Sequence, residues 1–568
     1  MNIRIARLTL SLAAAASLAG LHAQDDAVMK AMRDEMARSM KQLTLENLEK
    51  PYFIGYRVVD SDSSRVAASF GALNQSNSSR ERMVTVEVRV GDYKLDNSHF
   101  FSFNMDQGTT LSIFNGTTSL TVEDDYKELR RQLWLATDST YKKAVEDLSK
   151  KRAWLQNRTP SDDSADFSKE EPVTSSSELP PAKIDLPKWE NEARALSAIF
   201  RQMPAIQTSS LSFGVNNSYT RYLTSEGTSY TRREPTVTFN ASAATQASDG
   251  TALDDFVWFH GRSPAEIPSQ DQLAARLQGL GKYLSDLRDA PTLANYSGPV
   301  LIEADAAAQV FRLVFLNSLR GTKATIQSMP GMANNANNQA ENPFLDRVGA
   351  RVLPDFLTVV DNPLIGEYQG FHLAGQSKMD EDGMLSREVH LIDNGVLKTL
   401  LMARDPVRGF DHTTGSRHVG QAAPSNVIVT ASASLSAVDL RAKFIDLIKQ
   451  RNRPFGIVVR RLRNANTVVL AYKVFPDGHE ELVRSLQFVG LNAAAFKDIM
   501  AVSKEPNFLT VEYRPPANQG MIGAFDVEEN FTPVSLVVPS LLFEDATMRR
   551  IRGGATNPPV SSHPFFDK

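Results

Sequence analysis

The sequence predicts an α+β protein, with an N-terminal α+β domain followed by a β-rich C-terminal domain that is antiparallel and resembles a barrel or sandwich. Two observations lead to this prediction. In the first half, segments with helical spacing of apolar residues stand between segments in which apolar and polar residues alternate. In the second half, short strand-like segments separated by turn residues dominate. The 568 residues suffice for about three domains or two large ones, each with its own core.

The composition excludes several functional classes. The chain has no Cys, which removes disulfides, thiolate catalysis, zinc ribbons and iron–sulfur clusters. Any metal site must therefore consist of His, Asp and Glu. The 62 Lys and Arg residues are balanced by 66 Asp and Glu residues, and the formal net charge of −4 provides no basic surface for nucleic acid. We therefore expect no nucleic-acid partner.

Residues 1–23 have the pattern of a secretory signal peptide. Arg4 and Arg7 precede a run of apolar and small residues, and Ala23 stands at a suitable cleavage position. The run is too short for a comfortable membrane span, and no later segment qualifies as one. We expect cleavage after Ala23, no membrane span in the mature chain, and a periplasmic or secreted protein. An uncleaved N-terminal anchor is the alternative.

The N-terminal half is predicted to contain a helix over 24–50 and a domain over 51–292. From Val28 to Leu43 apolar residues recur every three or four positions, which is typical of an amphipathic helix. Further helices are expected over 123–154, 189–201 and 272–287, and strands over 52–59, 83–90 and 237–243. Ser, Asp, Glu and Pro dominate 157–182, which predicts a flexible insertion.

The C-terminal domain is predicted over 296–547. A short strand at 300–302 precedes a helix over 304–319 that is apolar on nearly every side and should be buried. Asn394-Gly395 marks a hairpin turn among the following strands, and a helix is expected over 440–450. The tail, residues 548–568, contains three Pro residues and is expected to be extended.

Five segments of the chain carry a resemblance to a known family. They cover 223–250, 380–410, 413–429, 472–488 and 539–545; the third, for example, is TTGSRHVGQAAPSNVIV. In this order they resemble the TldD/PmbA family, a group regarded as metallopeptidases and once called modulators of DNA gyrase, and the last two resemble an exported subgroup. The resemblance implies proteolysis as the family activity, the two-domain organisation described above, and a dimer around an internal cavity.

The same resemblance points to the helix over 304–319 as the place of the catalytic motif. Competent members carry HExxxH there, in which two His bind zinc and the Glu accepts a proton from bound water, and add a Cys ligand from farther on. Counting back from Gly321, these positions fall on Arg312, Leu313 and Asn317. Arg repels zinc, Leu accepts no proton and Asn is a weak ligand. The resemblance therefore implies a degenerate site without catalytic residues, as in the PmbA (TldE) branch.

His412 and His418 are weak candidates for a different metal site. They lie six residues apart in a segment rich in Thr, Gly and Ser. A metal needs at least a third ligand, which the sequence does not identify, so surface or hydrogen-bonding histidines are the simpler interpretation. We expect no cofactor, and zinc only if the chain is an active enzyme with a non-standard site.

The sequence favours an exported, metallopeptidase-related protein that handles peptides as the non-catalytic subunit of a peptidase assembly. Its expected partners are a peptide substrate and either a second copy or a paralogue that carries HExxxH. Two alternatives stay open. One is an active metallopeptidase with a site near His412 and His418, and the other is an envelope binding or scaffold protein that needs no catalytic sibling.

Overall fold

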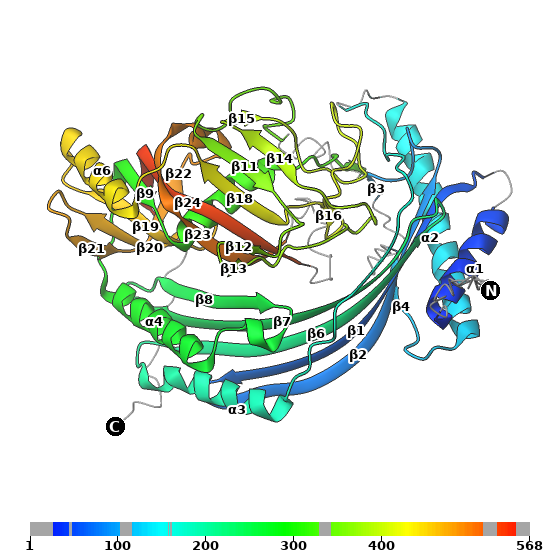
Figure 1. The fold of residues 1–568 in the computed structure, drawn as a ribbon, viewed down its shortest axis with the longest axis horizontal. Coiled ribbons are helices and arrows are strands. Elements are labelled where there is room, and N and C mark those ends of the chain that lie inside the picture. The colour runs from blue at the N-terminus through cyan, green and yellow to red at the C-terminus, as the bar shows by residue number, and fades with distance from the viewer. Residues whose placement is uncertain are drawn as a thin grey trace, which may run out of the picture.

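The structure is a computed structural model that describes residues 26–44, 48–102, 116–156, 158, 162–328, 342–514 and 531–551. The signal peptide predicted over 1–23, with its cleavage after Ala23, lies outside the described residues, and so do residues 552–568 of the predicted tail. Two large sheets organise the described chain, a seven-stranded one in the N-terminal half and an eleven-stranded one in the C-terminal half (Figure 1). With the helices that flank them, they confirm the α+β class.

The N-terminal sheet consists of long, strongly curved strands. The strand order is β4-β2-β1-β6-β7, and β5 and β8 both pair with β7. All neighbours are antiparallel except β5 and β7. The strands are β1 (Pro51–Ser69), β2 (Ala72–Val90), β4 (Thr117–Ser119), β5 (Thr174–Glu178), β6 (Thr208–Thr224), β7 (Ser229–Gln246) and β8 (Ala252–Gly261). The first two run far beyond their predicted ends because they pair with each other along their whole length and turn at Phe70 and Gly71, both at positive φ.

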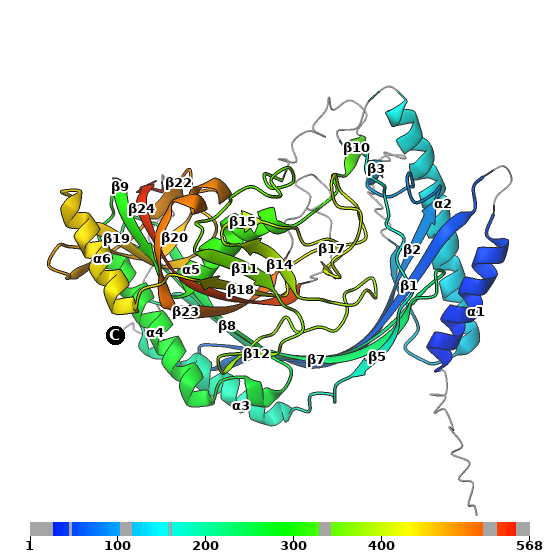
Figure 2. The same cartoon turned by 45° about the horizontal axis from the view of Figure 1, so that its top comes forward.

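Helices cover the convex face of this sheet (Figures 1 and 2). One end is covered by α1 (Ala27–Gln42) and α2 (Tyr126–Leu155), and the other by α3 (Leu186–Ser197) and α4 (Gln270–Asp289). Each helix begins at a side chain that accepts a hydrogen bond from a backbone N–H of the first turn, which fixes its start. These capping residues are Asp26, Asp125, Asp185 and Ser269.

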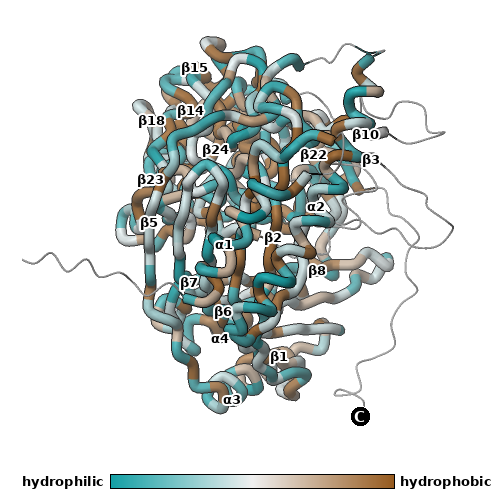
Figure 3. The backbone as a smooth tube through the Cα atoms, turned by 90° about the vertical axis from the view of Figure 1, so that its right-hand side faces the viewer, coloured by the Kyte–Doolittle hydropathy of each residue, from teal (hydrophilic) through white to brown (hydrophobic). Residues whose placement is uncertain are grey.

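The alternation of side chains along each strand separates an apolar convex face from a polar concave face. On β1, Tyr56 and Val58 pack in the core beneath α1 and α2, whereas Arg57 points to the other side and contacts Glu381 of the C-terminal half. Figure 3 shows how apolar and polar residues follow one another along these strands. The concave face is thus free of the helical layer and open to the second half of the chain.

The described residues of the segment 157–182 correct the prediction of a flexible insertion. Phe167 is buried, with its ring 5.0 Å from that of Phe53, and Asp166 and Ser168 beside it are buried too. Residues Thr174–Glu178 form β5, which pairs in parallel with β7. The polar composition led to a wrong prediction because a strand at the edge of a sheet exposes much of its surface and needs few buried apolar side chains.

The C-terminal sheet has the order β15-β14-β11-β18-β24-β9-β19-β20-β21, and β22 and β23 pair with β24. It is mixed, since the β18–β24 and β9–β19 pairs are parallel and the others antiparallel. The strands are β9 (Asn295–Ile302), β11 (Leu357–Asp361), β14 (Val389–Asp393), β15 (Val396–Leu397), β18 (Asn426–Ala431), β19 (Gly456–Leu462), β20 (Val468–Val474), β21 (Glu480–Val483), β22 (Leu486–Val489), β23 (Ile499–Tyr513) and β24 (Thr532–Arg550).

Two helical segments pack on opposite faces of this sheet. On one face, α5 (Asp305–Val310) continues into a wide turn, Phe311–Phe315, and a tight turn, Leu316–Leu319, so the buried helix predicted over 304–319 is present but irregular. On the other face lies α6 (Ala437–Gln450). Strand β9 serves both faces, since Val300 and Ile302 join the main core and Leu301 packs beneath α6.

Short elements complete the described chain. The parallel pair β3 (Phe100–Ser102) and β10 (Ile326–Ser328) joins the two halves. Two small hairpins and three short helical turns lie in the connections, namely β12 (Glu367–Tyr368) with β13 (Phe371–His372), β16 (Arg417–His418) with β17 (Gln421–Ala422), and the turns Ala198–Gln202, Pro264–Glu266 and Ala493–Asp498. None of the helices among the described residues is long and apolar enough to cross a membrane.

The C-terminal half lies in the concave face of the N-terminal sheet, which curves around it (Figure 2). Two ion pairs, which are largely shielded from solvent, join the two halves. Arg57 of β1 lies 3.2 Å from Glu381, and Arg404 lies 2.7 Å from Glu226, in the turn between β6 and β7. These contacts hold the polar face of the sheet against the loops of the C-terminal half and leave a cavity between them.

Candidate functional site

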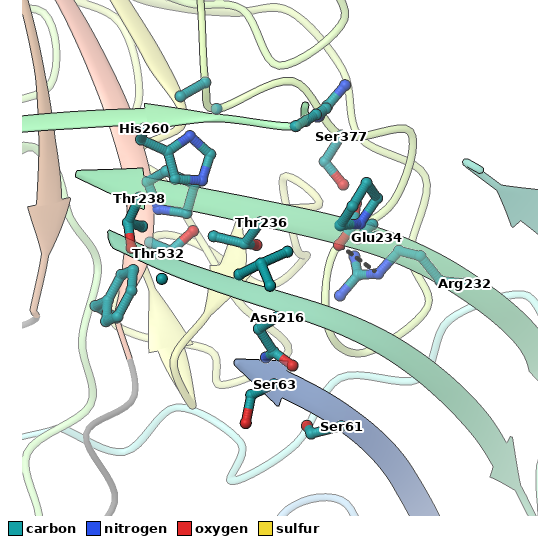
Figure 4. A pocket seen from close by; sticks show the side chains of 18 of the residues that line it. Ser61, Ser63, Asn216, Arg232, Glu234, Thr236, Thr238, His260, Ser377 and Thr532 are labelled. Atoms are coloured by element: carbon teal, nitrogen blue, oxygen red, sulfur yellow. Dashed lines mark ion pairs between the residues drawn. The ribbon is translucent and has the colours of Figure 1, made fainter. Parts of the chain in front are cut away.

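A cavity of about 560 Å³ lies between the concave face of the N-terminal sheet and the loops of the C-terminal half. Figure 4 shows side chains from both halves converging on it. Most are polar or charged. The sheet contributes Ser61, Ser63, Arg65, Asn216, Arg232, Glu234, Thr236, Thr238 and His260, and the C-terminal half contributes Gln376, Ser377, Glu381, His418 and Thr532.

The polar lining follows from the strand pattern of β7. Val237, Phe239 and Ala241 are buried beneath α3 and α4, so the residues between them must point the other way. Thr236 and Thr238 accordingly line the cavity. The alternation over 237–243 that predicts a strand therefore also determines which of its residues can face a ligand.

The charged groups of the cavity are mostly paired. Arg232 Nε lies 3.2 Å from Glu234 Oε2, as Figure 4 shows, and Arg262 donates a hydrogen bond of 2.9 Å to Gln376. Burial raises the pKa of Glu381, but the nearby Arg57 guanidinium and the hydrogen bonds from the N–H groups of Gly420 and Val419 more than reverse this and lower it to about 2. The carboxylate is therefore ionised at neutral pH, and the cavity presents dipoles and ion pairs rather than one dominant charge.

Two polar side chains of the sheet face the cavity without a partner among the described residues. Asn216 Oδ1 and His260 Nδ1 are both buried and make no hydrogen bond there. Burial, with the nearby Arg262, lowers the pKa of His260 to about 3, so its imidazole is neutral at pH 7. One acceptor and one imidazole nitrogen are thus available to a polar ligand.

The structure does not bring His412 and His418 together in one site. The His412 side chain is exposed, with Nδ1 3.5 Å from Glu170 Oε1. His418 is buried in the cavity wall, with Nε2 3.2 Å from Ser425 Oγ, and burial lowers its pKa to about 4. Among the described residues, no three His, Cys, Asp or Glu side chains gather closely enough to hold a metal ion.

The positions that the family resemblance assigns to HExxxH, Arg312, Leu313 and Asn317, lie on and just after the wide turn that follows α5. The N–H of Leu316 bonds to the carbonyl of Phe311, five residues back, which widens the helix here. This turn moves Arg312 and Asn317, which are five residues apart, towards the same side. Both are partly exposed, and so is Leu313, whereas the neighbouring Phe311 is buried.

A chain of hydrogen bonds determines which polar group of the Asn317 side chain remains available to a ligand. Arg320 is buried and donates to Tyr513 Oη over 3.0 Å and to the carbonyl of Ala422 and the side chain of Gln421. Because Arg320 only donates, the Tyr513 hydroxyl uses its proton to donate to Asn317 Oδ1 over 2.8 Å. The Asn317 oxygen is therefore occupied, and its NH₂ group remains as a donor.

Arg312 is a cation without a counter-ion. Within the described part of the chain its guanidinium forms no ion pair or hydrogen bond, its Nε is buried, and burial lowers its pKa. The oxygen of Asn317 already accepts a hydrogen bond from Tyr513. The surface around Arg312 and Asn317 therefore presents hydrogen-bond donors and positive charge. These residues do not fit a zinc ion, which needs acceptor ligands and is repelled by a neighbouring cation.

The unpaired cation leads to a prediction about stability. Replacing Arg312 with Met should raise the free energy of unfolding by about 1–2 kcal/mol, because the native protein keeps a largely buried charge without a partner. Urea denaturation measures the change. The exposed Arg408, which pairs with Asp346 at the surface, provides the control, and Arg408→Met should change stability by less than about 0.5 kcal/mol. A less stable Arg312→Met protein would contradict the prediction.

Sequence reasoning missed Arg320, Tyr513, Asn216 and His260. Arg320 directly precedes the Gly321 used to place the motif, so a second cation near Arg312 was visible in the sequence. Tyr513 ends β23 and carries no local signal, since it reaches Asn317 only through the sheet. Asn216 and His260 lie on strands whose alternation was detected only in the neighbouring β7.

Comparison with known proteins relates this fold to one family. Residues 296–550 match the model described as the PmbA/TldA metallopeptidase C-terminal domain. The structure resembles TldE from Thermococcus kodakarensis, with a TM-score of 0.57, 12% identity, and coverage of 91% of this chain and 99% of that one. No curated protein sequence gives a significant match.

Two further solved structures have the same fold, and both proteins are named as modulators of DNA gyrase. The one from Thermotoga maritima has a TM-score of 0.56 at 12% identity and covers 91% of this chain and 99% of its own. The one from Bacteroides thetaiotaomicron has a TM-score of 0.55 at 13% identity and covers 91% and 98%. At these identities the likeness shows the fold alone.

Proposed function

Because the chain belongs to the TldD/PmbA family, to whose metallopeptidase-related C-terminal domain residues 296–550 correspond, we propose that it is the non-catalytic, peptide-handling subunit of a peptidase assembly. One observation carries the proposal. The side of the helix where the family motif would bind zinc presents Arg312, Leu313 and the NH₂ of Asn317, and none of these can hold a metal or accept a proton.

The cavity supports the peptide-handling part of the proposal. Its volume of about 560 Å³ lies within the range of roughly 300–1,000 Å³ typical of ligand sites. A peptide backbone offers a donor and an acceptor at nearly every residue. The hydroxyls of Thr236 and Thr238 and the unpartnered Asn216 and His260 are suited to such a ligand.

The subunit role requires a partner that performs the chemistry. We propose that this partner is a paralogue with an intact HExxxH, and a second copy of this chain is the alternative partner. An active site around His412 and His418 is less favoured, because one is exposed beside Glu170 and the other is buried beside Ser425. We further propose export to the periplasm or beyond, on the pattern of residues 1–23.

The test combines metal analysis with a hydrolysis assay on the full-length protein, purified without an affinity tag. We expect substoichiometric zinc and no cleavage of a fluorogenic peptide library, with or without chelator. The proposal predicts that the same genome encodes an HExxxH-bearing relative, and adding that relative should form a complex and produce chelator-sensitive cleavage faster than the relative alone. The relative without this chain is the matched control.

Stoichiometric zinc together with chelator-sensitive cleavage by the chain alone would overturn the proposal and favour an active peptidase. In that case, replacing His412 and His418 with Ala would show whether those histidines carry the activity. If the relative neither binds the chain nor gains activity, the chain is a binding or scaffold protein that needs no catalytic partner.

A further inference from the structure

We propose that Arg312 and Asn317 form a carboxylate-binding site, which holds the C-terminal carboxylate of a peptide bound in the cavity. The site would lie where catalytic family members carry their metal, so an anion receptor replaces a cation site. The inference rests on the proposed function, since it takes a peptide to be the ligand.

The first step is the set of donors that the protein leaves unused. The Arg312 guanidinium carries five N–H groups and forms no hydrogen bond with another described residue. The Asn317 NH₂ adds two more, because its oxygen accepts from Tyr513. Both residues are partly exposed, so a ligand can reach them. The wide turn Phe311–Phe315 moves them towards the same side of the helix.

The second step is the charge of the surroundings. Arg320 lies behind Tyr513 and adds a second cation, and its hydrogen bonds go to the neutral oxygens of Ala422, Gln421 and Tyr513. Within the described residues, neither arginine forms an ion pair with a carboxylate. An anion therefore meets two uncompensated positive charges in a poorly solvated place, where electrostatic attraction is stronger than in water.

The third step is the shape of the anion. A guanidinium presents two parallel N–H groups, which match the two oxygens of a planar carboxylate. The Asn317 NH₂ can then donate to one of the same oxygens from the side. A protonated amine or a metal ion would find only donors here, so the site selects for negative charge.

The fourth step connects the site with the cavity. Tyr513, which holds Asn317, pairs with Thr532 in the β23–β24 ladder, and Thr532 lines the cavity. Gln421, which accepts from Arg320, pairs with His418 in a small hairpin, and His418 is also part of the cavity wall. Arg312 and Asn317 are not themselves part of the cavity wall, but two chains of contacts connect them to residues that are. The proposal places the C-terminal end of a peptide, bound in the cavity, at these donors.

The experiment compares two forms of one probe, namely fluorescein-labelled short peptides of random sequence that end either in a free carboxylate or in an amide. With the full-length protein, fluorescence anisotropy should show about tenfold tighter binding of the free acid, which corresponds to one charge-assisted bidentate contact. Arg312→Met should abolish this preference by weakening the binding of the free acid about tenfold, and it should weaken the binding of the amide much less, because the amide carries no charge. Arg312→Lys, which keeps the charge but lacks the fork, should retain part of it, and Arg408→Met should behave as the native protein.

Equal affinity for acid and amide, or a preference that persists in Arg312→Met, would overturn the carboxylate site and leave peptide handling intact. If neither peptide mixture binds, the proposed function fails. The carboxylate site is then tested separately, by comparing the Tm of the protein in sodium acetate with its Tm in sodium chloride of equal ionic strength. An acetate-dependent rise in Tm that Arg312→Met lacks supports the site, and an equal response of both proteins overturns it. A larger rise with sodium phosphate than with acetate would overturn its assignment to carboxylates.

Discussion

Replacing Glu226 with Gln is expected to lower the free energy of unfolding by about 3–5 kcal/mol, the largest effect predicted for this protein. Glu226 receives two hydrogen bonds from the guanidinium of Arg404, of 2.7 and 3.1 Å. Arg404 is fully buried, and its guanidinium also packs 3.9 Å from the Phe167 ring. Without the carboxylate, the buried cation keeps its desolvation penalty and loses its counter-charge.

Urea denaturation of the full-length protein measures this effect. Glu178→Gln is the matched control, because Glu178 pairs with Arg233 over 3.6 Å with both side chains about half exposed. That exposed pair should contribute less than about 1 kcal/mol. Since Glu226 belongs to the N-terminal sheet and Arg404 to the C-terminal half, the variant should also loosen the contact between the two. A loss no larger than that of the control would show that this pair does not hold the halves together.

Replacing Asp361 with Asn is expected to remove a pH dependence of stability worth up to about 4 kcal/mol, at about 1.4 kcal/mol for each pKa unit. Asp361 is buried on β11, with Oδ1 accepting from the N–H of Ser425 and Oδ2 without a partner among the described residues. Burial raises its pKa to about 7, although these backbone contacts oppose the rise. The carboxyl group is therefore neutral in the folded protein up to about pH 7.

The sign of the effect follows from comparing the folded and unfolded chains. Below about pH 4 the Asp361 carboxyl is protonated in both states and contributes nothing. Between about pH 4 and 7 it ionises only in the unfolded chain, so the native protein loses stability as the pH rises. Above pH 7 the loss is complete and no longer changes. The amide that replaces the carboxyl in Asp361→Asn does not titrate, so the variant should lack this decline.

The measurement is urea denaturation of the native protein and the variant at several pH values between 4 and 8. Asp380, whose pKa is raised to about 7 by burial and by Asp382, contributes the same decline to both proteins and cancels in the difference. Asp355→Asn, at an exposed position, should reproduce the native slope. A native slope in Asp361→Asn would mean that Asp361 is ionised in the folded protein.

The sequence allowed the helices and strands that form the layers of the fold to be predicted. The spacing between Val28 and Leu43 predicted α1, and the alternation of Val237 and Phe239 with Thr predicted β7 and its polar face. Both predictions succeed because periodicity reflects which face of an element is buried, a local property. The identities of Arg312 and Asn317 likewise indicated side chains unsuited to zinc, since ligand chemistry belongs to the side chain itself.

Only the tertiary structure decided which of these side chains meet. Tyr513 and Asn317 are joined by a hydrogen bond across almost two hundred residues of sequence, and this contact engages the amide oxygen and leaves the NH₂ group as a donor. The same holds for Phe167, whose burial fixes a segment that composition predicted to be flexible, and for His412 and His418, which lie close in sequence but in different environments. The residue types and periods of this chain determined its elements and the chemistry open to them. Long-range packing decided what each polar group is left to bind, because hydrogen bonds and burial depend on neighbours that no local pattern contains.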